Sequence, residues 1–175
     1  MTPESAPVSA AHSGLRVSTP DDLTILIERR FAAPRERVWD AMTRPELVRA
    51  WLSGPPGWSM TECTDPLEVG GRFRCVWTST AGASMAMTGV YRELSRPERI
   101  VRTESFEFGC DAQTGEQLCT LELVERDRGT DLRLTIRYDS REARDGSLAS
   151  GMEKGIGFAY EQLDDLLARS VEALV

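Results

Sequence analysis

The sequence predicts an α+β fold. It consists of a curved antiparallel sheet of six to seven strands, two short helices after strand one, and a long C-terminal helix packed over the concave face. Two observations predict it. The segment Phe31–Trp51 reads as two short helices between a first strand and a long run of later strands, and the end of the chain carries an apolar stripe at helical spacing. Because a sheet with one apolar face must cover that face, the stripe indicates a covering helix.

The segment Phe31–Trp51 carries local signals for both short helices. Pro34 stands where the first helix begins, because its missing N–H costs nothing in a first turn. The apolar face of this helix is formed by Val38, Trp39, Ala41 and Met42. Thr43 and Glu46 have the spacing of a capping box, which predicts a second helix with Thr43 as its N-cap.

The remaining strands alternate apolar and polar residues and are separated by short turns rich in Gly, Pro and Asp. We expect strands at Leu23–Phe31, Trp58–Cys63, Arg72–Thr78, Ser84–Leu94, Arg99–Phe108, Gln117–Glu125 and Thr130–Tyr138. Strands joined by such short turns form an antiparallel meander with one dry face and one wet face.

A final helical region follows Asp139 and Ser140, which are expected to cap it, and extends to about Val171. Gly146 and Gly151 are expected to divide it into a short and a long piece. The stripe of the long piece consists of Met152, Ile156, Ala159, Leu163, Leu166 and Ser170. Gly155 lies at its edge, where a glycine costs about 1 kcal/mol relative to alanine. Close approach of the sheet or of a ligand, and a plain weak spot in the helix, explain it equally well.

The bulk properties indicate one domain, residues 22–172, behind a disordered N-terminal tail of residues 1–21 that is rich in Ser, Ala and Pro. The net charge of −7 argues against nucleic acid as a partner. No apolar run approaches the ~20 residues of a membrane span, and the tail lacks the pattern of a signal peptide. A cytoplasmic location is therefore the default expectation.

The residue types present restrict the available chemistry. The single histidine, His12, falls in the expected tail, which argues against a histidine base, a catalytic triad or a zinc site with histidine. We therefore predict no catalytic residues, no metal and no cofactor. The four cysteines, Cys63, Cys75, Cys110 and Cys119, are widely spaced and are expected to be reduced thiols.

The predicted architecture leaves space for a ligand. A single helix about 10 Å wide does not fill the concave side of a sheet of six or seven strands, so the remaining volume is either side-chain core or a small-molecule pocket. The candidate ligand-binding residues are Trp39, Trp51, Phe73, Trp77, Met85, Met87, Tyr138, Met152, Gly155, Ile156 and Ala159. Tyr91, Arg102, Glu104 and Tyr138 are further polar candidates on strands, and the sequence leaves their direction open.

The order of elements resembles the helix-grip fold of the START-like (SRPBCC) superfamily, which includes the birch pollen allergen-like proteins. Within it, the motifs are similar to those of bacterial proteins named for their similarity to the activator of the heat-shock protein ninety ATPase. The resemblance covers about residues 22–170. The residues that carry it are Phe31–Trp51, Gly70–Phe73, Gly89–Tyr91, Pro97–Ile100, Gly129-Thr130 and Gly151–Asp164.

The leading hypothesis is a cytoplasmic binding protein that holds a small hydrophobic, amphipathic or lipid-like ligand between the sheet and the C-terminal helix. Its basis is an apolar helix stripe facing an apolar sheet, without a catalytic constellation. The resemblance also implies an alternative, a polyketide cyclase/dehydratase-like or hydrolase-like enzyme using Tyr, Glu and Arg in the same hollow. Regulation of a chaperone ATPase is a third hypothesis, suggested by the family label alone. A homodimer through edge strands or Phe158 stays open.

Overall fold

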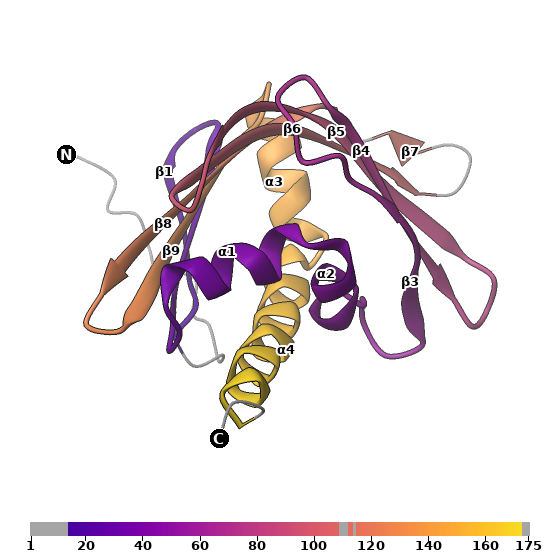
Figure 1. The fold of residues 1–175 in the computed structure, drawn as a ribbon. Coiled ribbons are helices and arrows are strands. Elements are labelled where there is room, and N and C mark those ends of the chain that lie inside the picture. Colours follow the sequence, from indigo (N-terminus) through magenta and orange to yellow (C-terminus); the bar gives the residue numbers. More distant parts are fainter. Residues whose placement is uncertain (1–13, 109–111, 114, 173–175) are drawn as a thin grey trace.

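The structure, a computed structural model, describes residues 14–108, 112–113 and 115–172. A strongly curved sheet arches over a long C-terminal helix, and two short helices lie beside that helix under the arch (Figure 1). The elements in chain order are β1 (Arg16–Asp21), β2 (Thr24–Phe31), α1 (Arg35–Thr43), α2 (Pro45–Trp51), β3 (Trp58–Thr64), β4 (Arg72–Ser79), β5 (Ser84–Ser95), β6 (Arg99–Phe108), β7 (Ala112–Gln113), β8 (Gln117–Arg126), β9 (Gly129–Arg137), α3 (Arg141–Ala149) and α4 (Met152–Glu172).

The strands form one antiparallel sheet in the order β1-β2-β9-β8-β6-β5-β4-β3, with the two-residue strand β7 paired to β6. All seven strands expected from the sequence are present, and the α+β helix-grip architecture is confirmed. The strand count differs from the expected six to seven because β1 and β7 add to it.

Strand β1 corrects the expected boundary between tail and domain. Arg16–Asp21 was assigned to the disordered tail, yet it pairs with β2, with Arg16 opposite Glu28. Val17 is buried, and Pro20 is tolerated because β1 is an edge strand whose outer N–H groups need no partner. The folded domain therefore begins before residue 22, and residues 1–13 of the expected tail lie outside the described residues.

The start of α2 differs from the predicted capping box. Its N-cap is Arg44, because Pro45 occupies the first helical position. No side chain caps the helix, since an arginine side chain has no acceptor oxygen. Thr43 instead ends α1, and its hydroxyl donates to the Trp39 carbonyl at 2.8 Å. Glu46 accepts from Arg44 Nε at 2.8 Å rather than closing a box with Thr43.

The C-terminal helical region divides at one of the two expected glycines. Ser140 caps α3 as expected, since its Oγ accepts from the Ala143 N–H at 3.1 Å. Gly146 lies inside α3 and does not break it, whereas Gly151 follows α3 with a φ of +86° and separates it from α4. No helix among the described residues is long and apolar enough to cross a membrane.

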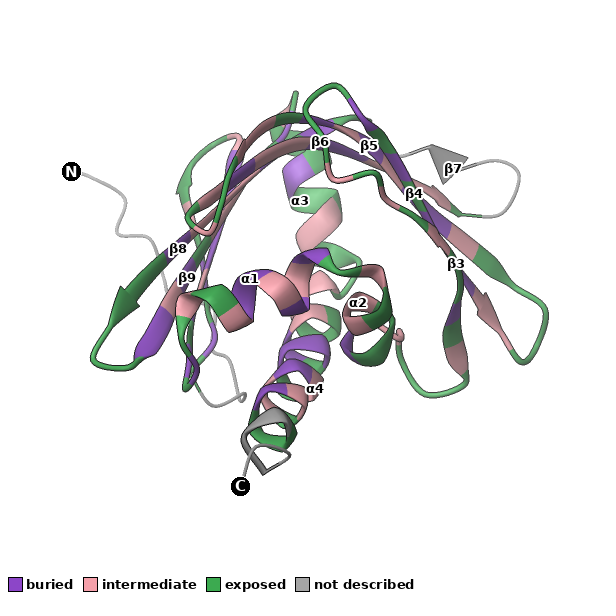
Figure 2. Cartoon of the chain, viewed as in Figure 1, coloured by how far each residue is buried: buried purple, intermediate pink, exposed green. Residues whose placement is uncertain are grey.

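The hydrophobic core lies between the concave face and the helices, where buried residues concentrate (Figure 2). Phe31 of β2 is fully buried and meets the ring of Tyr160 of α4 edge-on, with centroids 5.5 Å apart. Trp51 of α2 also lies beside Tyr160, with ring centroids 6.1 Å apart. Leu163, one turn further along α4, is also fully buried. The aromatic contacts thus hold α4 and α2 under the sheet.

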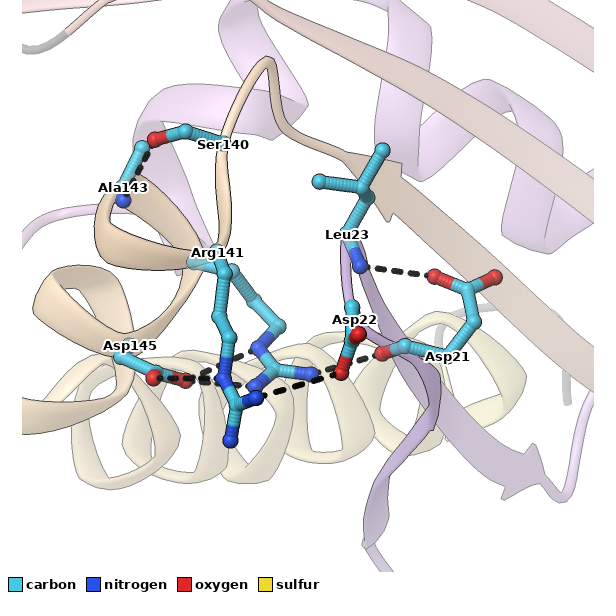
Figure 3. A network of polar contacts seen from close by, with 8 residues as sticks. Asp21, Asp22, Leu23, Ser140, Arg141, Ala143 and Asp145 are labelled. Carbon is cyan, nitrogen blue, oxygen red and sulfur yellow. Dashed lines mark hydrogen bonds and ion pairs between the residues drawn. The ribbon is translucent and has the colours of Figure 1, made fainter.

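A polar network attaches α3 to the turn between β1 and β2 (Figure 3). Buried Arg144 donates from Nη1 to the Asp21 carbonyl at 2.6 Å and from Nη2 to Asp145 Oδ1 at 2.7 Å. Asp21 also caps the turn, because its carboxylate accepts from the Leu23 N–H at 2.8 Å. That hydrogen bond, with a further one from Thr24, lowers the pKa of Asp21.

Gly89 in β5 lies very close to the backbone of β6 and to the Phe73 ring of β4. A Cβ at this position would lie 1.8 Å from the Thr103 carbonyl oxygen of β6 and 2.7 Å from the Phe73 ring of β4. The first of these contacts is with backbone, which a rotamer change does not relieve. Glycine is therefore required for the sheet to bend here.

We predict opposite effects for two Gly→Ala substitutions. Gly89→Ala should lower the free energy of unfolding by about 3 kcal/mol or more, because the added methyl overlaps backbone. Gly155→Ala should raise it by about 0.5–1 kcal/mol, because a Cβ there meets no heavy atom within 4 Å and alanine favours the helix. Urea denaturation followed by circular dichroism measures both, and equal effects of the two substitutions would contradict this account.

Candidate functional site

Polar side chains gather on the concave face where β5, β6 and β8 lie side by side. Arg102 and Glu104 are two residues apart on β6 and so share one face. The register places Tyr91 of β5 and Cys119 of β8 opposite Arg102, and Gln117 of β8 opposite Glu104. We call these five residues together with Asp65 the polar cluster.

Arg102 is the centre of the polar cluster. Its Nη2 lies 2.7 Å from Glu104 Oε1, and its guanidinium sits over the Phe73 ring at 4.6 Å from the centroid. Burial, the largest single effect, would lower the pKa of Arg102, but Glu104 together with Tyr91 and Cys119 outweighs it, and the pKa is raised. The Arg102 side chain retains 24% exposure and that of Glu104 11%, so the ion pair borders accessible space.

Glu104 and its neighbours on β8 form the second part of the polar cluster. Gln117 is buried and donates from Nε2 to Glu104 Oε2 at 3.3 Å. The same nitrogen lies 3.7 Å from Cys119 Sγ. Burial raises the pKa of Cys119, so its thiol stays protonated at neutral pH.

Tyr91 connects the polar cluster to the loop after β3. Its ring is 1% exposed, and its hydroxyl donates to Asp65 Oδ2 at 2.7 Å. Asp65 is itself fixed, because its Oδ1 accepts from the Leu67 N–H at 2.9 Å. Burial raises the pKa of Tyr91, so the phenol keeps its proton and acts as a hydrogen-bond donor.

Apolar side chains that are only half-buried lie around the polar cluster. Leu121 of β8 and Leu134 of β9 are direct partners on neighbouring strands, and both are half-buried. The residue pairs on both sides of them, Leu123 with Leu132 and Cys119 with Ile136, are buried. The other half-buried side chains of this kind are Met85, Phe106, Met152 and Ile156. These side chains pack against the core and keep part of their apolar surface exposed.

A second set of polar contacts closes the end of this region near α3. The Tyr138 hydroxyl, just after β9, donates to Ser147 Oγ of α3 at 2.8 Å. The Ser147 hydroxyl in turn lies 3.3 Å from the Met152 sulfur at the start of α4. Burial raises the pKa of Tyr138 to about 12.

The eleven candidate ligand-binding residues occupy three kinds of position. Trp39, Trp51, Phe73, Trp77, Met87, Tyr138 and Ala159 are buried, Met85, Met152 and Ile156 are half-buried, and Gly155 is exposed. Two indoles bond to helix backbone, since Trp51 Nε1 donates to the Ala41 carbonyl at 2.8 Å and Trp77 Nε1 to the Leu52 carbonyl at 2.7 Å. Trp51 and Trp77 thus anchor α2 between α1 and β4, and their role as ligand contacts stays a prediction.

The polar cluster was only partly visible in the sequence. Tyr91, Arg102 and Glu104 were named as candidates without a direction, and the register now shows that they share the concave face. Gln117 and Cys119 were missed as site residues, although their spacing of two residues from each other and from Leu121 puts all three on the same face of β8. Asp65 gave no signal, because it lies in a loop that only the fold brings to Tyr91.

Two cavities open elsewhere on the molecule. One, of about 410 Å³, lies between β2 and α4 and is lined by Arg29, Arg30, Ala32, Asp164, Leu167 and Ala168. The other, of about 310 Å³, is at the edge formed by β3 and β4 and is lined by Gly57, Trp58, Ser59, Thr61, Thr78, Ser79 and Thr80. None of the candidate ligand-binding residues lines either cavity. The predicted hydrophobic cavity under the sheet therefore stays a prediction.

No group of three or more His, Cys, Asp or Glu side chains within the described ranges is placed to hold a metal ion. The chemistry that the polar cluster offers is that of its own side chains. It presents a guanidinium paired with a carboxylate, a buried phenol donor and an amide. These groups can orient a polar group of a bound molecule by hydrogen bonds.

Comparison with known proteins identifies the relatives of this chain. A family described as "Activator of Hsp90 ATPase homolog 1-like protein" matches residues 32–168. A crystal structure from Rhodobacter sphaeroides is 35% identical, with a TM-score of 0.82, over 90% of this chain and 99% of that one. One from Mycobacterium smegmatis is 25% identical, with a TM-score of 0.77, over 91% and 99%. Among proteins with curated descriptions, none matches.

The three tyrosines predict a late alkaline transition. Burial raises the pKa of Tyr91, Tyr138 and Tyr160 above the usual 10.0, and to about 12 for Tyr138. The folded chain therefore binds these protons more tightly than the unfolded chain, and the stability they contribute is complete below pH 10.0 and lost as the pH rises through their folded pKa values.

We expect the native protein to show little tyrosinate absorbance at about pH 11, where a free tyrosine is mostly ionised. Above that, the absorbance should rise together with the loss of the far-ultraviolet circular dichroism signal. A spectrophotometric titration of the folded protein, with the urea-unfolded protein as reference, measures this. Ionisation of all three tyrosines near pH 10.0 in the folded state would contradict the burial described.

Proposed function

We propose a ligand-binding function for this chain, which belongs to the family of Activator of Hsp90 ATPase homolog 1-like proteins within the START-like superfamily. A small hydrophobic or amphipathic ligand would bind between the concave face and α4. One observation carries the proposal. Half-buried apolar side chains occur on the concave face and on α4, and the Arg102–Glu104 ion pair on the same face of the sheet keeps 24% and 11% of its two side chains exposed.

The apolar part of the ligand would contact the middle of the concave face. Leu121 and Leu134 on the sheet, and Met152 and Ile156 on α4, hold apolar surface that the chain's own packing leaves partly uncovered. Covering such surface contributes about 25 cal/mol for each Å² removed from water. Methionine side chains, here Met85 and Met152, adapt to ligands of different shape.

The polar part of the ligand would meet the polar cluster. Arg102 uses one edge of its guanidinium for Glu104 and keeps 24% of its side chain exposed, which leaves donors for a ligand oxygen. Small-molecule sites commonly combine an apolar lining with a few polar groups that fix orientation. A molecule with an apolar body and one polar end fits this arrangement. We propose the cytoplasm as the compartment in which it is bound.

A thermal-shift panel of fatty acids, flavonoids and polyketides tests the proposal. At a ligand concentration of about 100 times Kd, binding stabilises the folded state by roughly 2.7 kcal/mol, which corresponds to a rise in Tm of about 5–10 °C for a chain of this size. We expect at least one member of the panel to produce such a rise.

Two filling variants locate the binding site. Ile156→Trp fills the space between α4 and the sheet and should abolish the shift. Ala168→Trp fills the cavity between β2 and α4 and should leave the shift unchanged. Loss of the shift in Ala168→Trp but not in Ile156→Trp, with both variants folded by circular dichroism, would place the ligand elsewhere and overturn the proposal.

A second candidate function is an enzyme of the polyketide cyclase/dehydratase-like or hydrolase-like type in the same region. The observation that favours it is the buried Tyr91 phenol, hydrogen-bonded to Asp65, with the Arg102 guanidinium carbon 5.9 Å from the centroid of its ring. If a substrate carbonyl oxygen took the place of Asp65 as acceptor of the single phenol proton, the phenol and the guanidinium together would stabilise negative charge that develops on that oxygen.

A direct assay separates this candidate from simple binding. A linear poly-β-ketone thioester should be converted to a cyclised or dehydrated product, and Tyr91→Phe should reduce the rate about 10²-fold or more by removing one donor. Arg99→Gln, on the outward face of the neighbouring strand β6, is the control and should keep the wild-type rate. Binding of the compound without turnover would be consistent with the proposed ligand binding and would exclude this enzymatic activity for that substrate.

A further inference from the structure

Two cysteines face each other on neighbouring strands. Cys63 of β3 and Cys75 of β4 are direct partners in the antiparallel register. Their sulfur atoms lie 2.6 Å apart, and both are free thiols. Antiparallel partners have Cα atoms about 4.5–5.5 Å apart, which lies within the range that a disulfide spans. The sequence, in which the two positions are twelve residues apart, had indicated only separate thiols.

The other described cysteine is not part of this pair. Cys119 lies on β8, is 3% exposed, and has Gln117 Nε2 as its hydrogen-bond partner. Strands β4, β5 and β6 lie between β8 and β3 in the sheet. Cys63 and Cys75 are thus each other's nearest thiol among the described residues.

The two thiols have different surroundings. Cys63 is half-buried on the edge strand, whereas Cys75 is 3% exposed. The hydrogen bond with Cys75, helped by the Arg49 and Arg102 guanidiniums, lowers the pKa of Cys63 against the opposing effects of burial and of Asp65. The same hydrogen bond, together with burial, raises the pKa of Cys75. The accessible member of the pair is therefore also the one that ionises first.

We propose that Cys63 and Cys75 are an oxidation site, at which a peroxide converts the two thiols reversibly to an intrachain disulfide between β3 and β4. The Cys63 thiolate attacks a peroxide oxygen, an S–O bond forms, the O–O bond breaks, and the leaving hydroxide takes a proton to become water. The Cys75 sulfur then attacks the sulfur of the Cys63 sulfenic acid: an S–S bond forms, the S–O bond breaks, and the hydroxide leaves as water with the Cys75 proton. Two thiols and one hydrogen peroxide give one disulfide and two waters.

The position of the pair makes this oxidation consequential for the edge of the sheet. Strand β3 lies at one edge of the sheet, and among the described strands its one partner is β4. Asp65, the hydrogen-bond acceptor of Tyr91, follows β3 directly. A disulfide two residues before Asp65 joins the loop that carries it covalently to β4. This proposal is independent of the identity of any ligand.

Mass spectrometry of the reduced full chain, treated with hydrogen peroxide and then alkylated, tests the proposal. We expect the wild type to lose two hydrogen atoms and both alkylation sites, a peptide map to link Cys63 with Cys75, and dithiothreitol to reverse the change. In Cys75→Ser, dimedone should trap a sulfenic acid at Cys63. In Cys63→Ser, Cys75 should remain a thiol. Cys119→Ser is the matched control and should behave as the wild type.

Three outcomes would overturn the proposal. The wild type could keep both thiols under conditions that oxidise glutathione in the same tube. The peptide map could link a different pair of cysteines. Dimedone could label Cys63→Ser as readily as Cys75→Ser, which would make Cys63 no more reactive than its partner. Because the first two outcomes are measured on the wild type, a variant that fails to fold does not affect them.

Discussion

The curved sheet requires a glycine at position 89, where no side chain fits. This glycine allows β5 to approach the Thr103 carbonyl of β6 and the ring of Phe73 on β4, and so allows the sheet to bend. The Phe73 ring then supports the Arg102 guanidinium, which pairs with Glu104. A flat sheet would neither enclose α4 nor bring the polar cluster under cover. Curvature, core and candidate site are thus consequences of one local requirement.

The polar cluster contributes little to the stability of a hydrophobic core, but its groups can bind the polar part of a ligand. Replacing a buried ion pair by apolar residues of similar volume is often neutral or stabilising, so Arg102 and Glu104 are not explained by stability alone. Natural sequences depart from the rules of core design mainly at functional positions. Tyr91, Gln117 and Asp65 satisfy the polar atoms around the pair, which fixes it in one geometry. This combination supports a ligand-facing role for the concave face.

Most of the fold could be predicted from the sequence, because alternation and turn residues are local signals. These signals located all seven strands from Leu23 to Tyr138 and the division of the terminal helices at Gly151. The errors arose where one local signal outweighed another. Pro45 overrode the Thr43 capping box, and pairing with β2 ordered a Ser- and Pro-containing segment as β1. The candidate site was harder, because the meeting of Asp65 with Tyr91, or of Cys63 with Cys75, depends on register between strands.

A crystal structure with the most stabilising compound of the panel bound shows whether the space between the concave face and α4 receives the ligand. We expect the compound against Leu121, Leu134 and Ile156, with its polar end within hydrogen-bond distance of the Arg102 guanidinium. A compound bound instead in the cavity beside Arg29 and Asp164, with the space under the sheet filled by the chain's own side chains, would contradict this expectation.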